Sequence, residues 1–329
     1  TQMCEKTVVS APLCPTGYTY DVNTQTCTLV ETSLADCVPD INFDVTSTDW
    51  GALTTAVAWE NFFSSQPNAG TTTVTNFSLV GGRVQLSVST SLTSLYLGSK
   101  NITNVSVIVI NTMEELFLNA NNIVNFNPTS SFSTSLNSIS LSGNQIVSFN
   151  PTIPLPEGLM SLSMANNDII EFNPTIPLPS TLEELYLYGN SLTNFNPTIP
   201  LPSALKMLAL SDNQILVFNP TLSLPNGLES LHLQVNNITN FNPTIALPNT
   251  IKRMYLNGNN LTSFNPTTGV PSGLQYLGLA NNNISVSSWN TNTAWINSAP
   301  NNAEIFADNS ILGTTTFSLL TSKVWTITI

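Results

Sequence analysis

Hydrophobic positions recur along most of the chain at a fixed spacing. Within each copy of the pattern LxxLxLxxNxI, apolar and polar residues alternate, as at Leu185 and Leu187, which predicts a short strand with one buried face. Nine copies in phase, separated by 23 residues after a first step of 21, predict strands that stack into one parallel sheet. The copies begin at Leu92, Met113, Leu136, Leu159, Leu182, Leu205, Leu228, Ile251 and Leu274.

Two further columns repeat in the same phase. An Asn falls where the chain turns away from each strand, and its amide can satisfy backbone groups that the turn leaves unpaired, so stacked copies would form a hydrogen-bonded ladder. These residues are Asn121, Asn144, Asn167, Asn190, Asn213, Asn236, Asn259 and Asn282. A Phe follows in each repeat and would stack as an aromatic spine through the core. These residues are Phe126, Phe149, Phe172, Phe195, Phe218, Phe241 and Phe264.

Each Phe of the spine is followed by Asn-Pro-Thr, and six copies then close with Leu-Pro or Val-Pro. Prolines at two fixed positions per repeat exclude a helix there and favour extended backbone. The segment from Leu178 to Asn190 reads LPSTLEELYLYGN, which resembles the bacterial-type LPxxLxxLxLxxN repeats of the leucine-rich-repeat superfamily. The resemblance implies a solenoid of about nine to ten repeats, with a curved parallel β-sheet and an irregular, helix-poor convex side.

An open solenoid needs a cap at each end, and both flanks of the repeats carry candidates. Residues 49–63 have apolar side chains near helical spacing behind an N-cap Asp49, so we expect a cap helix; these are Trp50, Leu53, Val57 and Phe62. A degenerate first repeat is expected from the apolar offsets that follow, at Val74, Phe77, Leu79 and Val84.

The carboxyl-terminal flank predicts a helical plug and a closing strand. Trp289, Trp295 and Ile296 suggest the plug, and an irregular turn through Phe306 to Ile311 would follow it. The alternating residues 323–329 predict the strand. A short helix ahead of this Lys-x-Trp-Thr-Ile ending resembles the termini of leucine-rich surface and phage proteins of the Bacteroidetes group.

The amino-terminal segment differs from the rest in charge and in cysteine content. Residues 1–60 hold eight carboxylates against Lys6 alone, which accounts for −7 of the net charge of −12. Cys4, Cys14, Cys27 and Cys37 lack the close CxxC pairs of a zinc site. They indicate two disulfides with three possible connectivities, and four free thiols in a reducing compartment are the alternative.

The stretch CPTGYTY from Cys14 onwards resembles short modules on phage and surface proteins. The resemblance implies a role in attachment or assembly with other structural proteins. We therefore expect four parts: an acidic attachment module at 1–45, a cap with a degenerate repeat at 46–91, leucine-rich repeats at 92–284, and a carboxyl-terminal cap at 285–329.

Composition excludes two classes of partner. Apolar residues make up 41% of the 329-residue chain, but charged residues make up only 8%, against roughly 25% in an ordinary soluble domain. Seven cations cannot form a phosphate-binding stripe, so nucleic acid is excluded as a partner. Since no apolar run approaches the length that spans a bilayer, we expect no membrane insertion.

The sequence holds no signature of an enzyme, and we expect no catalytic residue, metal or cofactor. A Ser-His-Asp arrangement could be centred only on His232, the single histidine. Glu115 and Glu184 share a column but lie three strands apart, roughly 14 Å, which is beyond the distance that glycoside hydrolysis needs.

Aromatic side chains gather on the outward, concave face of the predicted sheet. The candidate ligand-binding residues are Tyr96, Phe117, Tyr186, Tyr188, His232, Arg253, Tyr255 and Tyr276. Exposed Tyr and Arg beside Ser and Asn are residue types that contact proteins and glycans. The alternative is that Tyr is present for its strand propensity alone.

A row of Thr behind each Asn-Pro also repeats at strand spacing, from Thr129 to Thr267. Regular Thr rows occur on ice-binding solenoids. We expect instead that each hydroxyl caps a local turn.

These features predict a non-enzymatic recognition or adhesion scaffold outside the host cell. A virion-associated fibre or decoration protein is the preferred form, binding a protein or glycan on a cell surface through the concave face. One alternative is a secreted or cell-surface bacterial adhesin. The other is a purely structural virion or filament subunit, which would associate through its ends or its amino-terminal module. The expected location is extracellular or on a virion.

Overall fold

The computed structural model describes residues 18–21, 26–29, 41–45, 56–66, 72–80, 83–90, 92–108, 110–129 and 131–329. The chain divides into two compact units, Thr1–Pro39 and Asp40–Ile329. In the first unit, β1 (Tyr18–Asp21) and β2 (Thr26–Leu29) pair antiparallel. Cys27 lies in β2, whereas the other three cysteines lie outside the described residues, so the disulfides stay a prediction.

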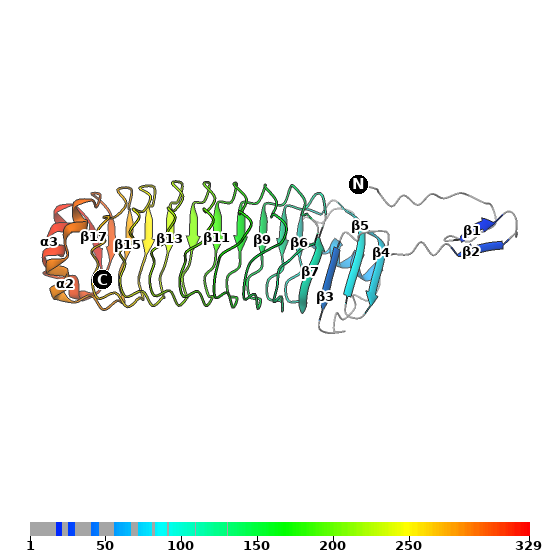
Figure 1. Cartoon of the computed structure of the whole chain (residues 1–329), viewed down its shortest axis with the longest axis horizontal. Coiled ribbons are helices and arrows are strands. Elements are labelled where there is room, and N and C mark those ends of the chain that lie inside the picture. Colours follow the sequence, from blue (N-terminus) through cyan, green and yellow to red (C-terminus); the bar gives the residue numbers. More distant parts are fainter. Residues whose placement is uncertain are drawn as a thin grey trace. The chain divides into compact units, whose positions relative to one another are not determined.

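The second unit is built on a parallel sheet in which eleven strands of the described residues pair in chain order (Figure 1). From β6 to β15 each strand of this sheet begins two residues after a repeat start, which confirms the register that the pattern predicts. The strands are β6 (Ser94–Tyr96), β8 (Glu115–Phe117), β9 (Ser138–Ser140), β10 (Ser161–Ser163), β11 (Glu184–Tyr186), β12 (Met207–Ala209), β13 (Ser230–His232), β14 (Arg253–Tyr255), β15 (Tyr276–Gly278), β16 (Glu304–Phe306) and β17 (Thr326–Thr328).

One face of this sheet is buried and the other faces outward. In β11, Leu185 is fully buried, while its neighbours Glu184 and Tyr186 are partly exposed on the opposite face. Leu182 and Leu187, just outside the strand, are also fully buried. We name the outward surface of β6 and β8–β17 the sheet face, and the opposite wall, which contains the Asn-Pro-Thr segments, the loop side.

The Asn column forms the predicted ladder. Asn190 is 8% exposed, and its Nδ2 donates to the carbonyls of Leu187 at 2.9 Å and Met164 at 3.0 Å. Its Oδ1 accepts from the backbone N–H of Ile169 at 3.0 Å. The same set of bonds recurs at all eight positions from Asn121 to Asn282. Each Asn therefore joins its own repeat to the preceding one.

The Phe column forms the predicted spine. All seven rings are at most 3% exposed, and Phe149 and Phe172 stack with ring centroids 6.2 Å apart. At the carboxyl-terminal end the spine continues into the cap, because Trp295 packs edge-on against Phe264 at 5.1 Å and against Trp325 at 6.2 Å.

The loop side is connected differently from the expectation. Thr198 donates to Asn173 Oδ1 from both its backbone N–H, at 3.0 Å, and its hydroxyl, at 2.7 Å. Equivalent pairs recur from Thr152 to Thr267. The expectation of a local turn cap was therefore wrong: these hydroxyls join neighbouring repeats, because the Asn lies 25 residues earlier in the chain. Within the described part of residues 92–284 no helix occurs.

The segment interpreted as a degenerate repeat is instead an antiparallel hairpin. β4 (Thr72–Val80) pairs with β5 (Arg83–Thr90), and the two join β3 (Ile41–Val45) and β7 (Ile102–Ile108) in the sheet order β4-β5-β3-β7. The sequence Gly-Gly between alternating apolar runs favours a hairpin over a repeat. Because β3 pairs with β5 and β7, the end of the proposed 1–45 module belongs to the second unit.

A helix, α1 (Ala56–Ser64), packs against β4 of the antiparallel sheet. Its buried face consists of Trp59 and Phe63, whereas Val57, predicted to face inward, is 64% exposed. Asp49, Trp50 and Leu53 lie outside the described residues. The Gln66 side chain, just after the helix, accepts from the backbone N–H of Tyr96 at 2.9 Å and so satisfies a donor on the outer edge of β6.

The carboxyl-terminal cap alternates short helices with the last two strands. Its helices are α2 (Val286–Thr291), the 3₁₀ helices η2 (Ala294–Asn297) and η3 (Asn309–Ile311), and α3 (Thr315–Ser322). Trp289, Trp295 and Ile296 are at most 3% exposed, as a plug requires, and β17 lies in the segment expected to close the sheet. No helix among the described residues is long and apolar enough to cross a membrane.

Removing one ring of the spine should destabilise the whole array. Phe195→Ala should lower the free energy of unfolding by about 3–5 kcal/mol, because the ring is 2% exposed and its loss leaves a cavity. Since repeats support one another, a denaturant titration should show one shifted transition. Ile170→Ala is the control, because Ile170 is 57% exposed, and it should change stability by about 0.5 kcal/mol or less. A loss below about 1 kcal/mol for Phe195→Ala would contradict the buried spine.

The buried Asn column, which we name the inner ladder, should contribute more to the free energy of unfolding than the Asn–Thr pairs of the loop side, which we name the outer ladder. Asn190→Ala leaves the Ile169 N–H unpaired in the interior and removes one of the two side-chain donors of the Leu187 and Met164 carbonyls, which keep Asn213 and Asn167. It should cost about 2–3 kcal/mol in urea unfolding. Asn196→Ala removes the acceptor of exposed Thr221, which water can replace, and should cost about 1 kcal/mol or less. Equal losses would mean that burial does not set the strength of the inner ladder.

Candidate functional site

The sheet face presents its side chains in columns that run across the strands. The parallel register places His232 of β13 beside Tyr255 of β14, and Arg253 of β14 beside Tyr276 of β15. All eight candidate residues project from this face or from its edge. The structure brings them together as three separate groups rather than one.

The largest group lies on β13–β15 and consists of Ser230, His232, Arg253, Tyr255 and Tyr276; we name it the aromatic cluster. The rings of His232 and Tyr255 stack with centroids 4.4 Å apart, and the rings of Tyr255 and Tyr276 lie 4.9 Å apart. The Ser230 hydroxyl is 2.9 Å from His232 Nε2 and fixes the imidazole. Arg253 is exposed beside these rings. The cluster therefore offers ring edges, hydroxyls and one guanidinium to a ligand.

Gly278, two residues after Tyr276 in β15, lies next to the last ring of the cluster. A Cβ at Gly278 would lie 3.4 Å from the Tyr276 ring and 2.9 Å from Asn257 Oδ1. A side chain here would therefore displace the Asn257 amide and would touch the Tyr276 ring. The distance between Gly278 and the Tyr276 ring depends on a side-chain direction that no sequence pattern states.

Burial and neighbouring charge shift the pKa values of two residues of the aromatic cluster. Burial lowers the pKa of His232 below its ordinary 6.5, and the Arg253 charge lowers it further. Burial raises the pKa of Tyr276, with added contributions from Tyr255 and Glu304. Both groups are therefore neutral at pH 7. Glu304 was not foreseen as a neighbour, because β16 follows β15 outside the 23-residue period.

The second group is on β11 and just beyond it. The rings of Tyr186 and Tyr188 meet edge to face, with centroids 6.4 Å apart. Burial raises the pKa of Tyr186 to about 12, and the Glu184 carboxylate contributes to the rise. Tyr186 is therefore a neutral hydrogen-bonding group at all physiological pH values.

The third group joins β6 and β8. Tyr96 and Phe117 stack with ring centroids 4.4 Å apart, and Tyr96 is 37% exposed. Serines of β9 and β10 separate this pair from Tyr186 by three strand steps, roughly 14 Å.

The geometry around His232 does not assemble a hydrolytic triad. The side chain bonded to its Nε2 is Ser230, which is 5% exposed and so inaccessible to a substrate carbonyl. Glu115 accepts from the Ser94 hydroxyl at 2.8 Å, three strands away from Glu184. Across the described residues, no group of three His, Cys, Asp or Glu side chains could hold a metal ion.

The repeats, the strand register and the buried Asn ladder together define the fold of a leucine-rich-repeat solenoid. No family model matches the sequence, and no curated protein matches it. Among solved structures, YopM from Yersinia enterocolitica is 24% identical, covers 59% of this chain and 43% of its own, and gives a TM-score of 0.41. The match therefore spans less than half of the YopM chain.

Two further solved structures are similar to this chain. A Leptospira interrogans leucine-rich-repeat protein is 17% identical, covers 67% of each chain and gives a TM-score of 0.31. The functional domain of InlJ from Listeria monocytogenes is 13% identical, covers 68% of this chain and 77% of its own, and gives a TM-score of 0.22. These bacterial structures give no support to the resemblance to phage proteins.

The single histidine makes the environment of the aromatic cluster measurable. Proton NMR of the imidazole should give a pKa below 6.5 for His232, and Arg253→Gln should raise it while burial still holds it below that value. The unfolded chain binds the proton first as pH falls, so stability should decrease below pH 6.5 as the unfolded state becomes protonated. A pKa at or above 6.5 in the folded protein would contradict the buried position of the ring.

Proposed function

We propose that this chain is a non-enzymatic recognition scaffold that works outside the host cell and binds a protein or a glycan on a cell surface. The aromatic cluster is the observation that supports this proposal. Its rings are preorganised by stacking at 4.4 and 4.9 Å and by the Ser230–His232 hydrogen bond. Ordered side chains lose little further conformational entropy on binding, which favours affinity.

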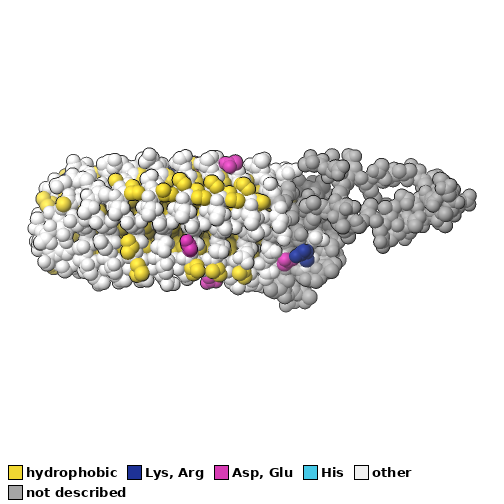
Figure 2. Space-filling view, viewed as in Figure 1, with side chains coloured by type: hydrophobic (Ala, Val, Ile, Leu, Met, Phe, Trp, Pro, Cys, Tyr) yellow, Lys and Arg dark blue, Asp and Glu magenta, His cyan; other side chains and the backbone are white. Residues whose placement is uncertain are grey.

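The choice of partner follows from the types of side chain. Tyr and Arg supply much of the binding energy where proteins recognise one another, and Tyr hydroxyls also suit the hydroxyls of sugars. The surface is poor in charge, as the face in Figure 2 illustrates, and only 8% of all residues are charged. A phosphate-rich partner such as nucleic acid is therefore disfavoured.

The finer proposal is a virion-associated fibre or decoration protein, with a secreted or cell-surface bacterial adhesin as the alternative. An Asn- and Thr-rich surface with few lysines is suited to work outside a cell. The acidic segment within Thr1–Pro39 forms a unit of its own, and we propose that it attaches the solenoid to other structural proteins.

The sheet face can be tested with a paired substitution. The labelled full chain is applied to glycan arrays and to panels of bacterial cells, and its binding is compared with that of Tyr255→Ala/Tyr276→Ala. Loss of two hot-spot aromatics should weaken binding by about 2 kcal/mol or more each. Both side chains are partly exposed, so folding should be retained.

Thr175→Ala/Thr198→Ala on the loop side is the matched control and should leave binding intact. If the Tyr variant binds as well as the wild type, the sheet face is not the recognition surface. If, in addition, deletion of residues 1–39 prevents incorporation into a particle or filament, the structural-subunit alternative replaces the recognition scaffold.

A further inference from the structure

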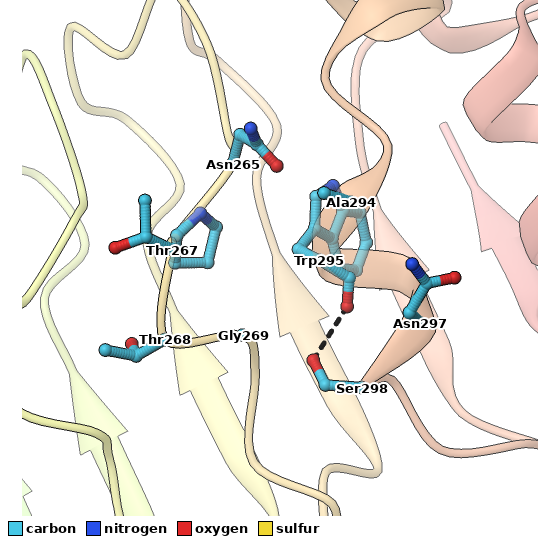
Figure 3. Close-up of a pocket in the computed structure, with 9 residues that line it drawn as sticks. Asn265, Thr267, Thr268, Gly269, Ala294, Trp295, Asn297 and Ser298 are labelled. Atoms are coloured by element: carbon cyan, nitrogen blue, oxygen red, sulfur yellow. Dashed lines mark hydrogen bonds between the residues drawn. The ribbon is translucent and has the colours of Figure 1, made fainter.

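A pocket of about 370 Å³ lies between the last Asn-Pro-Thr segment and the 3₁₀ helix η2 of the cap (Figure 3). Its walls include Asn265, Thr267 and Thr268 on the repeat side, and Trp295 and Asn297 on the cap side. We name it the cap pocket. It lies on the loop side of the last full repeat, and its lining residues do not include any of the aromatic cluster.

Asn265 is the member of the outer Asn–Thr ladder that lacks its usual partner. In the six preceding copies, from Asn127 to Asn242, the side-chain oxygen accepts from the Thr 25 residues later. At the corresponding place after Asn265 the chain has Asn290, which itself accepts from Thr315 at 2.9 Å. Within the described part of the chain, Asn265 Oδ1 is buried and has no hydrogen-bond partner.

The cap side of the pocket holds an unpaired hydrogen-bond donor, which complements the unpaired acceptor of Asn265. Trp295 is 1% exposed, and its indole Nε1 likewise has no hydrogen-bond partner among the described residues. Figure 3 shows the Asn265 side-chain oxygen directed toward the Trp295 ring. Asn265 and Trp295, which carry an unpaired acceptor and an unpaired donor, therefore both line the cap pocket. Native proteins leave few such groups without a partner.

We propose that the cap pocket binds a small neutral molecule with several hydroxyl groups, such as a single sugar ring or a polyol. One hydroxyl would donate to Asn265 Oδ1 and accept from Trp295 Nε1, because a hydroxyl carries a donor and acceptors on the same atom. It would take the place that the Thr hydroxyl occupies in the six preceding copies.

The lining limits the ligand further. No charged side chain lines the pocket, so neither an anion nor a cation would be compensated there. A volume of about 370 Å³ is near the lower end for ligand sites and suits one ring rather than a chain of them. Pro266 and the Trp295 ring offer apolar surface, while Thr267, Thr268 and Asn297 offer polar groups, a mixture that suits the C–H and O–H faces of a sugar.

The test is a titration of the full ¹⁵N-labelled chain with glycerol, glucose, galactose, mannose and N-acetylglucosamine. The chain has five Trp, and Trp295→Phe assigns the indole N–H signal of Trp295. A saturable shift of that signal is expected with at least one of these probes. Asn265→Ala should weaken the apparent affinity by about tenfold, since one hydrogen bond to a buried group is lost.

Asn219→Ala is the matched control, because it removes an acceptor from the same ladder two copies earlier and should leave the titration unchanged. Unaltered indole signals of Trp289 and Trp325 will show that the cap of each variant is folded. Shifts that stay linear with every probe, or a saturable shift that Asn265→Ala does not weaken, would overturn the proposal. The proposal would also be overturned if the Trp295 indole N–H contacted only water in the presence of every probe, since solvent would then fill the cap pocket.

Discussion

The buried Asn amide is the interaction on which the rest of this solenoid depends. Strands of three residues exchange few backbone hydrogen bonds, and the chain leaves each strand through a turn whose polar groups face the interior. The Asn190 side chain pairs two carbonyls and one N–H at that point. Because one of those carbonyls and the N–H belong to the preceding repeat, the same amide that satisfies the turn also sets the stacking register. The same register spaces the Phe rings of the spine and the side chains of the sheet face.

Sequence periodicity predicted the elements that recur in every repeat. It failed where the pairing of a strand depends on a distant segment of the chain. The strand starts, the inner ladder and the spine were predicted because each needs only one residue type at one offset. Val74 and Phe77 fit the same offsets by chance, and their pairing with a strand beyond Gly-Gly overrode the pattern. Helical spacing likewise placed Val57 inside, whereas contact with the antiparallel sheet turned Trp59 and Phe63 inward instead.

For the candidate site, the sequence predicted which side chains share a column across the strands of the sheet face. Register alone places His232 beside Tyr255, and a one-residue slip would have turned both rings inward. The Ser230–His232 bond and the close approach of Gly278 to the Tyr276 ring required atomic positions. The cap pocket could not be foreseen at all, because it arises where the ladder is interrupted and Asn290 turns to a different partner.

The serine-rich strands β9 and β10 separate two aromatic groups of the sheet face. The repeats from β8 to β11 meet their neighbours through the same Asn, Phe and Thr contacts, so the gain or loss of one whole repeat between these strands would preserve each contact. Such a change would move the Tyr96–Phe117 pair away from or toward Tyr186 by one strand spacing, about 4.8 Å. The array therefore sets this distance in discrete steps of one strand spacing, and duplication of a repeat could change the distance between the proposed binding groups without altering either group.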